Sequence, residues 1–420
     1  MLMMDENILE YLSNTTKKEI FKLNSIAKDR GYFSYFIGGM VRDWILKKPI
    51  KDIDMVIEGD AIEIAKIYSK KYHISIQCFP NFQTARIPLE DKYFTNIDLS
   101  STRKEIYESS GALPKVSSGN LQDDLYRRDF TINTLCYSLD TLEIIDLFHG
   151  KEDIKNRKIR VLHSRSFIDD PTRILRAIRF KNRFKFQYEK LTKRYVIEAI
   201  NERVFTTISS DRIKKELILC LQEEELGKIL LDFINLNILD TLFFIGNIST
   251  EQFTWLQEID KIIENEDKVL TRLLIIFFHG NQESIKKFCD FYQINKNYKD
   301  LLINNRKTFL EIENKLKKQN LTPFEIYKLF LPLKREQSIF LRVYLQKEFF
   351  MKKLFEYYNC KLKGTRIFIT GKDLISLEIP PGPIYSIIFE ELLKNKINFG
   401  WKTKEQEIKY IKKNIKGWRK

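Results

Sequence analysis

The stretch from Tyr35 to Asp54, YFIGGMVRDWILKKPIKDID, constrains this chain more than any other. An apolar run ends in two glycines, a short helical pattern with Arg42 follows, and Asp52 and Asp54 then precede a second apolar run. Alternate side chains of a strand share a face, so the two carboxylates are expected to converge at the strand's start. Converging carboxylates beside a glycine turn suit a hard divalent cation that carries phosphates. The pattern therefore predicts a Mg²⁺-dependent nucleotidyl-transfer site, with Arg42 as a source of positive charge.

Composition limits the class of protein. A chain of 420 residues with 43% hydrophobic residues is long enough for several domains, and its formal charge of +15 favours a polyanionic partner. The five cysteines are scattered without a CxxC pair, which predicts neither a zinc site nor a disulfide framework. No apolar run approaches the ~20 residues that span a bilayer. We expect a soluble, cytoplasmic protein with no membrane association and no obligate protein partner.

Secondary-structure patterns change near residue 150. From Tyr32 to about Ile145, short strand-like runs alternate with helices, which predicts an α+β head with a mixed sheet. The expected strands are 32–37, 53–58, 74–79, 84–89 and 93–99, with a helix over 61–71. The Ser- and Gly-rich stretch Ser100–Gln122 is expected to be a long loop. From Gly150 onward helical periodicity dominates, so the remainder is expected to be all-α.

A second group of charged residues lies in Asp123–Asn133, DDLYRRDFTIN. Asp129 is expected to cap a helix that follows it, which would place Arg128 beside the helix N-terminus. A guanidinium there suits phosphate and ribose oxygens. On its own the RRD sequence also fits a salt-bridged surface helix, but its position downstream of the glycine turn and paired aspartates favours a nucleotide role.

A third group lies in Asp169–Phe180, DDPTRILRAIRF, which opens with a helix-start signal at Asp170-Pro171. At helical spacing, three arginines share one arc and apolar residues occupy the other side: Arg173, Arg176 and Arg179. An aspartate and an arginine three residues apart can read a base edge, because Asp accepts from the exocyclic amino group of cytosine or adenine. The alternative is that Asp170 only caps the helix and the arginines form surface ion pairs. Ser210–Leu217, SDRIKKEL, is interpreted as a structural helix start.

In this order, the three groups resemble the class II tRNA nucleotidyltransferase and bacterial poly(A) polymerase family. The matching stretches cover most of residues 30–220: Ile37–Ile57, Leu121–Leu135, Ile145–Leu162, Phe167–Phe180 and Asp211–Leu217. The resemblance implies a polymerase-beta-like nucleotidyltransferase head followed by an all-α neck, body and tail. The expected division is a head over 1–150, a neck for base selection over 151–220, an RNA-binding body over 221–360 and a basic tRNA-binding tail over 361–420.

The resemblance also implies roles for single residues. Asp52 and Asp54 match the family's catalytic, metal-binding carboxylates, and Mg²⁺ is the implied cofactor. The matching nucleotide-binding positions are Gly39, Arg42, Arg128, Asp170, Arg173, Arg176 and Arg179. Asp98, near the end of an expected strand, is a candidate for a third metal ligand. No histidine is followed by Asp, so the His-Asp phosphohydrolase domain of some relatives is not expected.

The resulting hypothesis is addition of CCA, or of its terminal A, to the tRNA 3′ end from CTP and ATP, with pyrophosphate release. Members that add only CC tend to have a shortened Ser100–Gln122 loop, and the long loop here argues against that product. The segment GALPKV within it resembles A-adding members, so A-only addition stays open. Poly(A) polymerase acting on RNA 3′ ends is the alternative reaction, and a non-catalytic RNA-binding protein is the alternative from another class.

Overall fold

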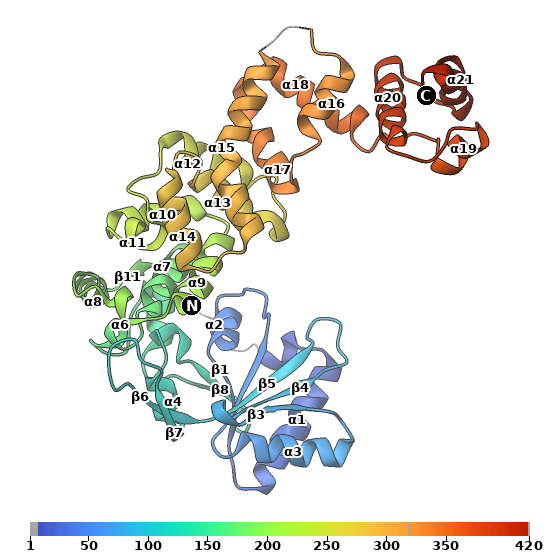
Figure 1. Ribbon diagram of the computed structural model, residues 1–420. Helices are drawn as coiled ribbons and strands as arrows, with labels where there is room; N and C mark the ends of the chain where they lie inside the picture. The colour runs from blue at the N-terminus through green and yellow to red at the C-terminus, as the bar shows by residue number, and fades with distance from the viewer. Residues whose placement is uncertain (1–6, 318–319, 419–420) are drawn as a thin grey trace. The chain divides into compact units, whose positions relative to one another are not determined.

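The computed structural model describes residues 7–317 and 320–418 (Figure 1). The chain divides between Thr241 and Leu242 into two compact units. The first unit holds the sheet and the helices that surround it, and the second is helical. The four-part division expected from sequence stays a prediction, but the expected α+β head followed by helices is confirmed.

A seven-stranded mixed sheet forms the centre of the first unit, in the order β3-β4-β5-β2-β1-β8-β9. Its strands are β1 (Ser34–Ile37), β2 (Ile53–Ile57), β3 (Gln77–Phe79), β4 (Thr84–Pro88), β5 (Asn96–Ser101), β8 (Cys136–Ser138) and β9 (Ile144–Ile145). Only β2 and β5 pair in parallel, and their register sets Asp54 opposite Asp98. This parallel pair, joined through α3 (Ala61–Tyr72), brings two carboxylates from separate strands together.

Two long helices pack beside the sheet, because their apolar residues recur at helical spacing. In α1 (Asn14–Asp29) the residues Ile20 and Leu23 are fully buried, and in α3 so are Ile64 and Tyr68. The two helices contact each other, and α3 contacts β4 and β5. Helices α1 and α3 therefore cover the sheet with apolar side chains, and this packing fixes the positions of β2 and β5.

Two expectations about local structure are wrong. Residues 100–122 are not a plain loop, because they contain the antiparallel hairpin of β6 (Arg103–Ile106) and β7 (Lys115–Ser118). Likewise no α-helix follows Asp129: a 3₁₀ turn over Thr131–Asn133 leads directly into β8. Pairing across a hairpin and across the sheet is a long-range interaction, which local sequence signals did not reveal.

The remaining helices of the first unit follow the sheet in the chain and alternate with short turns. They are α2 (Gly39–Ile45), α4 (Leu121–Tyr126), α5 (Gly150–Lys155), α6 (Ser166–Asp169), α7 (Thr172–Phe184), α8 (Lys190–Asn201), α9 (Ser210–Gln222) and α10 (Leu226–Asn235). A small parallel pair, β10 (Lys158–Ile159) with β11 (Gln187–Tyr188), precedes α8. Helix α7 packs against α9 and α10, so both of its faces are covered. Helix α11 (Leu239–Phe243) follows at the boundary between the two units.

The second unit is built from helices around aromatic residues. Its helices are α12 (Thr250–Ile259), α13 (Lys268–Ile276), α14 (Gln282–Phe291), α15 (Lys296–Leu316), α16 (Pro323–Phe330), α17 (Arg335–Tyr344), α18 (Phe349–Tyr357), α19 (Gly371–Ser376), α20 (Ile384–Phe399) and α21 (Lys404–Trp418). Trp255, Phe278, Phe309 and Phe340 contact one another, with the Phe309 and Phe340 ring centroids 5.0 Å apart. No helix in the described ranges is long and apolar enough to cross a membrane.

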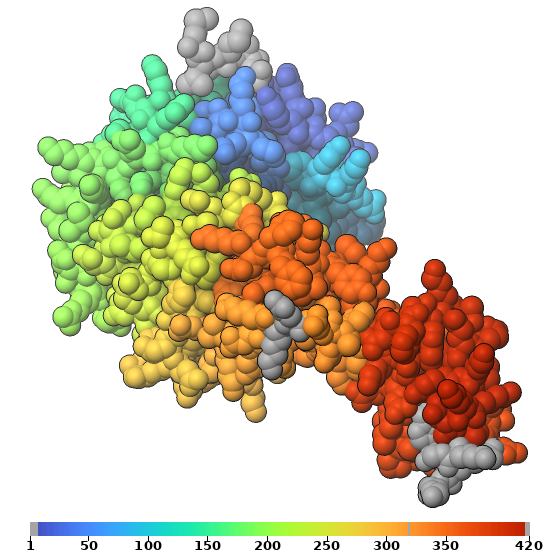
Figure 2. All heavy atoms as spheres, turned by 90° about the horizontal axis from the view of Figure 1, so that it is seen from above, coloured from blue at the N-terminus to red at the C-terminus, as the bar shows by residue number. Residues whose placement is uncertain are grey.

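The last helices, coloured red in Figure 2, have a small core of their own. It contains Ile369, Leu374, Ile379, Ile388, Leu392 and Ile411. The buried Glu407 carboxylate accepts hydrogen bonds from the backbone of Phe368 and Ile369 and pairs with Lys396 at 2.9 Å. The basic tail is thus a folded element rather than a charged extension of the chain.

Candidate active site

The glycine turn has a strict steric requirement at Gly38. This residue has φ of 69° and ψ of −124°, a conformation that only glycine adopts without strain. A Cβ added to Gly38 would lie 2.6 Å from Nη1 of Arg128, whereas one added to Gly39 would meet Arg42 at an ordinary 3.5 Å. The sequence pointed to Gly39 as the nucleotide-contacting glycine, but Gly38 is the residue that lets a guanidinium approach the turn.

Three carboxylates gather where β2 and β5 run side by side. Asp52 is exposed just before β2, Asp54 is partly buried within it, and Asp98 is the register partner of Asp54. Burial raises the pKa of Asp54 to about 6; the nearby Arg128 opposes this shift, and the negative charges of Asp98 and Asp52 add to it. The site therefore concentrates negative charge that a cation would neutralise.

A cavity of about 400 Å³ lies against Asp54. Its lining includes Asp98 and three arginines: Arg86, Arg103 and Arg127. Arg86 forms two hydrogen bonds to Asp98, of 2.7 and 3.0 Å, so Asp98 already has a positively charged partner. A larger cavity, of about 630 Å³, lies between α8 and α10 and contains none of the predicted site residues.

The donor set fits a hard divalent cation shared with a triphosphate. Within residues 7–317 and 320–418, no three His, Cys, Asp or Glu side chains converge closely enough to enclose a metal by themselves. Asp54 lines the cavity of about 400 Å³, and the negative charge of Asp52 acts on Asp54. Mg²⁺ is commonly bound by one or two carboxylates together with phosphates and water, which agrees with this arrangement.

Arg128 connects the first two groups of residues. Its Nη2 donates to Asp124 Oδ2 at 3.0 Å, and its buried Nε has no hydrogen-bond partner in the described part of the chain. Arg127 also pairs with Asp124, at 2.6 Å. Burial alone would raise the pKa of Asp124, but the two guanidiniums hold it below its ordinary value. Asp124 therefore anchors Arg128 between the glycine turn and Asp54.

Arg42 is held by protein groups. Its Nη1 donates to Asn133 Oδ1 at 2.6 Å, its Nε to Asp43 Oδ1 at 2.8 Å, and its guanidinium lies 4.7 Å from the Phe184 ring centroid. Burial lowers its pKa, although Asp43 and Asp129 oppose that shift. Its contacts join α2 to the end of α7, which is a structural role. Its contact with a nucleotide stays a prediction.

Asp129 is a buried carboxylate that accepts hydrogen bonds from two other side chains, and it does not cap a following α-helix. Its Oδ2 accepts from Arg176 Nε at 2.8 Å, and its Oδ1 accepts from Asn133 Nδ2 at 2.7 Å. Burial would raise the pKa of Asp129, but these donors lower it to about 2. Asp129 thereby joins the second group of charged residues to helix α7.

Two of the four arginines on α7, Arg176 and Arg179, face a carboxylate of α9. Glu216 accepts from Arg176 Nη1 at 3.0 Å and from Arg179 Nη2 at 3.1 Å. The pKa of Arg176 is raised: burial lowers it, but Asp129 and Glu216 more than compensate. Both arginines thus bind α7 to its neighbours, and their nucleotide-binding role stays a prediction.

Asp170 and Arg173 lie at the start of α7, as the sequence predicted. Asp170 Oδ1 accepts from the backbone N of Thr172 at 3.0 Å, which is the expected capping contact. The Arg173 guanidinium is buried, with Nη1 donating to Ser166 Oγ and Nη2 donating to the backbone oxygen of Arg127, both at 2.7 Å. The Arg173 contact ties the base-reading candidates directly to the RRD segment.

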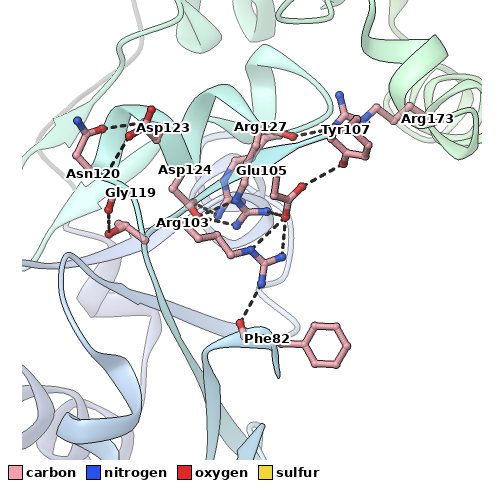
Figure 3. A network of polar contacts seen from close by, with 12 residues as sticks. Phe82, Arg103, Glu105, Tyr107, Gly119, Asn120, Asp123, Asp124, Arg127 and Arg173 are labelled. Atoms are coloured by element: carbon pink, nitrogen blue, oxygen red, sulfur yellow. Dashed lines mark hydrogen bonds and ion pairs between the residues drawn. The ribbon is translucent and has the colours of Figure 1, made fainter. Parts of the chain in front are cut away.

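A further carboxylate, Glu105 on β6, organises this region (Figure 3). Figure 3 shows Arg103, Arg127 and Tyr107 pointing toward it. Arg103 donates to Glu105 Oε1 at 2.9 Å, Arg127 at 3.1 Å, and the Tyr107 hydroxyl donates to Oε2 at 3.1 Å. Burial and the Glu105 charge raise the pKa of Tyr107 to about 12.

Sequence reasoning missed Glu105, and it missed Arg212, whose side chain donates to Asp170. Alternation of charge in the stretch RKEIY was the only local sign of a strand carrying Glu105, and we read that stretch as loop. The structural role expected for residues 210–217 agrees with the contacts of Glu216 to Arg176 and Arg179. The structure brings Gly38, Asp54 and Arg128 together, and joins Arg128 to Asp170 and Arg173 through the RRD backbone.

Comparison with known proteins agrees with this arrangement. Residues 34–160 match the family model described as the poly A polymerase head domain. An A-adding tRNA nucleotidyltransferase of Geobacter sulfurreducens is 30% identical over 392 residues, which are 89% of this chain and 44% of that protein. A solved CCA-adding enzyme in apo form II has a TM-score of 0.81 and 27% identity, covering 97% of this chain and 98% of that chain. A Thermotoga maritima CCA-adding enzyme complexed with tRNA has a TM-score of 0.75 and 26% identity, covering 97% of each chain.

The sheet, glycine turn and paired aspartates define a polymerase-type head with a helical extension. The chain belongs to the family of CCA-adding and A-adding tRNA nucleotidyltransferases and poly(A) polymerases, as its sequence motifs predicted. It spans about half the length of the curated relatives that it matches.

Proposed function

We propose that this chain is a template-independent tRNA nucleotidyltransferase that adds CCA, or its terminal A, from CTP and ATP. The observation that carries the proposal is the position of Arg128, whose guanidinium reaches the Gly38 turn and acts on the charge of Asp54. The glycine turn lies beside this guanidinium, and the charges of Arg128 and Asp52 both act on Asp54. Nucleotidyl transfer needs these groups in one place.

Asp52 and Asp54 would hold a divalent cation, which we take to be Mg²⁺. When bound, the cation supplies positive charge for the triphosphate and activates the attacking hydroxyl. Arg128, anchored by Asp124, orients the phosphates of the nucleotide and offsets their charge. The raised pKa of Asp54 means that acid conditions protonate this carboxylate and weaken its hold on the cation.

Base selection is assigned to Asp170 and Arg173. A carboxylate oxygen of Asp170 would accept from the exocyclic amino group shared by cytosine and adenine, which uracil and guanine lack at that position. Neighbouring groups fix the side chains of Asp170 and Arg173, so the protein itself would present the hydrogen-bond donors and acceptors that recognise the base. Gly39, Arg42, Arg176 and Arg179 are further proposed nucleotide-binding residues, and the three arginines also bind neighbouring protein groups.

The helical second unit and its basic tail are proposed to bind tRNA. Residues 361–420 contain fourteen Lys and Arg against six Asp and Glu, and such a surface favours phosphates. Solved relatives include a CCA-adding enzyme complexed with tRNA and another with ATP, which supports both substrates here. We also propose a cytoplasmic location, where tRNA processing would occur.

The A-adding relative of Geobacter sulfurreducens favours A addition, whereas the two solved structures named above are CCA-adding enzymes. Poly(A) addition is the second candidate, because the matched head model is that of poly A polymerases. The hairpin β6–β7 fills the stretch that is shortened in CC-adding members, which argues against CC as the product.

One extension assay separates these products. ATP and CTP, one of them labelled, are supplied together. The acceptors are tRNAs that end at the discriminator base, at C or at CC, and an unrelated RNA. A CCA-adding enzyme extends all three tRNAs to one final length, and an A-adding enzyme extends only the CC-ending tRNA. Extension of the unrelated RNA by many residues would instead establish poly(A) polymerase, and no extension of any RNA would refute the proposal.

A further inference from the structure

The carboxylate of Asp170 is held by more than its own helix. Its Oδ1 accepts from Thr172 N at 3.0 Å, from Thr172 Oγ1 at 2.6 Å and from Arg212 Nη2 at 2.8 Å. In the described part of the chain all hydrogen bonds to this carboxylate fall on Oδ1. With Oδ1 fixed from two sides, Oδ2 is left with a defined direction for a ligand.

The other terminal nitrogen of the Arg212 guanidinium contacts a different segment. Arg212 Nη1 donates to the backbone oxygen of Gly111 at 2.7 Å. Gly111 lies at the end of the β6–β7 hairpin, between β6 and β7 in the chain, with φ of 69°. One side chain in the first turn of α9 therefore touches both the hairpin end and the base-reading carboxylate.

The hairpin end is packed closely where Arg212 reaches it. A Cβ added to Gly111 would lie 2.5 Å from Ile208 Cγ2 and 2.6 Å from the Thr207 oxygen. The Gly111 N–H also donates to the backbone oxygens of Ile168 and Asp169, both at 3.3 Å. The hairpin end thus rests on the residues that lead into α7 and α9.

We infer that Arg212 is a positioning residue for base selection, which orients Asp170 and fixes the hairpin end against it. This inference rests on the proposed reading of the base by Asp170. The planar guanidinium donates to two acceptors at once in fixed directions, whereas a lysine ammonium at the same place keeps the charge but not the fork. Arg212 acts through Asp170, and its effect is on the choice of nucleotide.

The test compares Arg212→Lys and Arg212→Gln with Lys215→Gln, a control at an exposed position of the same helix. Competition binding of ATP and GTP in the full chain gives the ratio of their dissociation constants. We expect each Arg212 variant to lower the preference for ATP by about tenfold, in the range of one charge-assisted hydrogen bond, while the control keeps it. Hydrogen exchange of residues 108–113 should quicken in both Arg212 variants, because the Gly111 oxygen loses its partner.

The two readouts separate the inference from the proposed function. If wild-type protein binds ATP and GTP equally, base reading by Asp170 fails, and the exchange data still show whether Arg212 holds the hairpin. If wild-type prefers ATP and the Arg212 variants keep both that preference and the slow exchange of 108–113, the inference is overturned. Quickened exchange with an unchanged nucleotide preference also overturns it, because Arg212 would then be only structural.

Discussion

The ionised carboxylate of Asp54 should destabilise the folded state of the protein. Its pKa is raised from 3.8 to about 6. One unit of pKa corresponds to about 1.4 kcal/mol, so ionisation of Asp54 disfavours the native state by ~3 kcal/mol. Between these two pKa values the folded protein binds more protons than the unfolded chain, so stability falls as pH rises from about 4 to 6 and the deficit is complete above pH 6.

The substitution Asp54→Asn removes this ionisation while keeping the shape of the side chain. In EDTA at pH 8 the variant should be more stable than wild type by up to ~3 kcal/mol, which for the first unit corresponds to a rise in melting temperature of about 5–10 °C. The difference in stability between Asp54→Asn and wild type should decrease as pH falls through 6 and should be small near pH 4. Thermal unfolding of wild type, Asp54→Asn and the exposed control Asp29→Asn across this pH range measures it.

This reasoning is refuted if the stabilities of wild type and Asp54→Asn change in parallel with pH. If wild type and Asp54→Asn differ by a constant amount from pH 4 to 8, Asp54 is not held in a site that penalises its charge. A second arm adds Mg²⁺ and a nucleoside triphosphate, which should stabilise wild type and leave Asp54→Asn unchanged, since binding to the native state raises its stability.

Three further results are expected. Gly38→Ala should destabilise the protein by ~1–3 kcal/mol and slow nucleotide addition, because φ of 69° disfavours a side chain; equal melting temperatures and rates for this variant and the unhindered control Gly246→Ala would contradict it. Glu216→Ala should cost ~3 kcal/mol, since Arg176 and the buried Arg179 lose the partly buried carboxylate that they share, and denaturant unfolding beside Glu216→Gln measures this. Affinity for tRNA, followed by fluorescence anisotropy, should fall at least about tenfold between 50 and 200 mM salt, and an insensitive affinity would disconnect the net charge of +15 from RNA binding.

The sequence predicted the parts of the site that depend on local geometry. Strand alternation predicted Asp52 and Asp54 at the start of β2, a glycine pair predicted the turn, and the helix-start signal placed Asp170 at the beginning of α7. Each of these inferences needs only residues within a few positions of one another. The parallel pairing of β2 with β5, which sets Asp98 beside Asp54, needed the complete sheet.

The sequence could not reveal long-range partners. The arginine arc of α7 was correct in its spacing, but the sequence did not reveal that Arg176 pairs with Asp129 and Glu216, which lie 47 and 40 residues away. The hairpin carrying Glu105 was read as loop, because short polar strands have little intrinsic signal. Buried ion pairs between distant segments thus decided which arginines support the structure.

Labelled-nucleotide incorporation by Asp54→Asn, measured beside its tRNA affinity, tests the central claim most directly. Wild type should extend tRNA when Mg²⁺ is present and stop in EDTA. Asp54→Asn should bind tRNA as wild type does and incorporate no nucleotide, because the carboxylate pair would hold the cation required for transfer. Extension of tRNA by Asp54→Asn at the wild-type rate would contradict the assignment of this site.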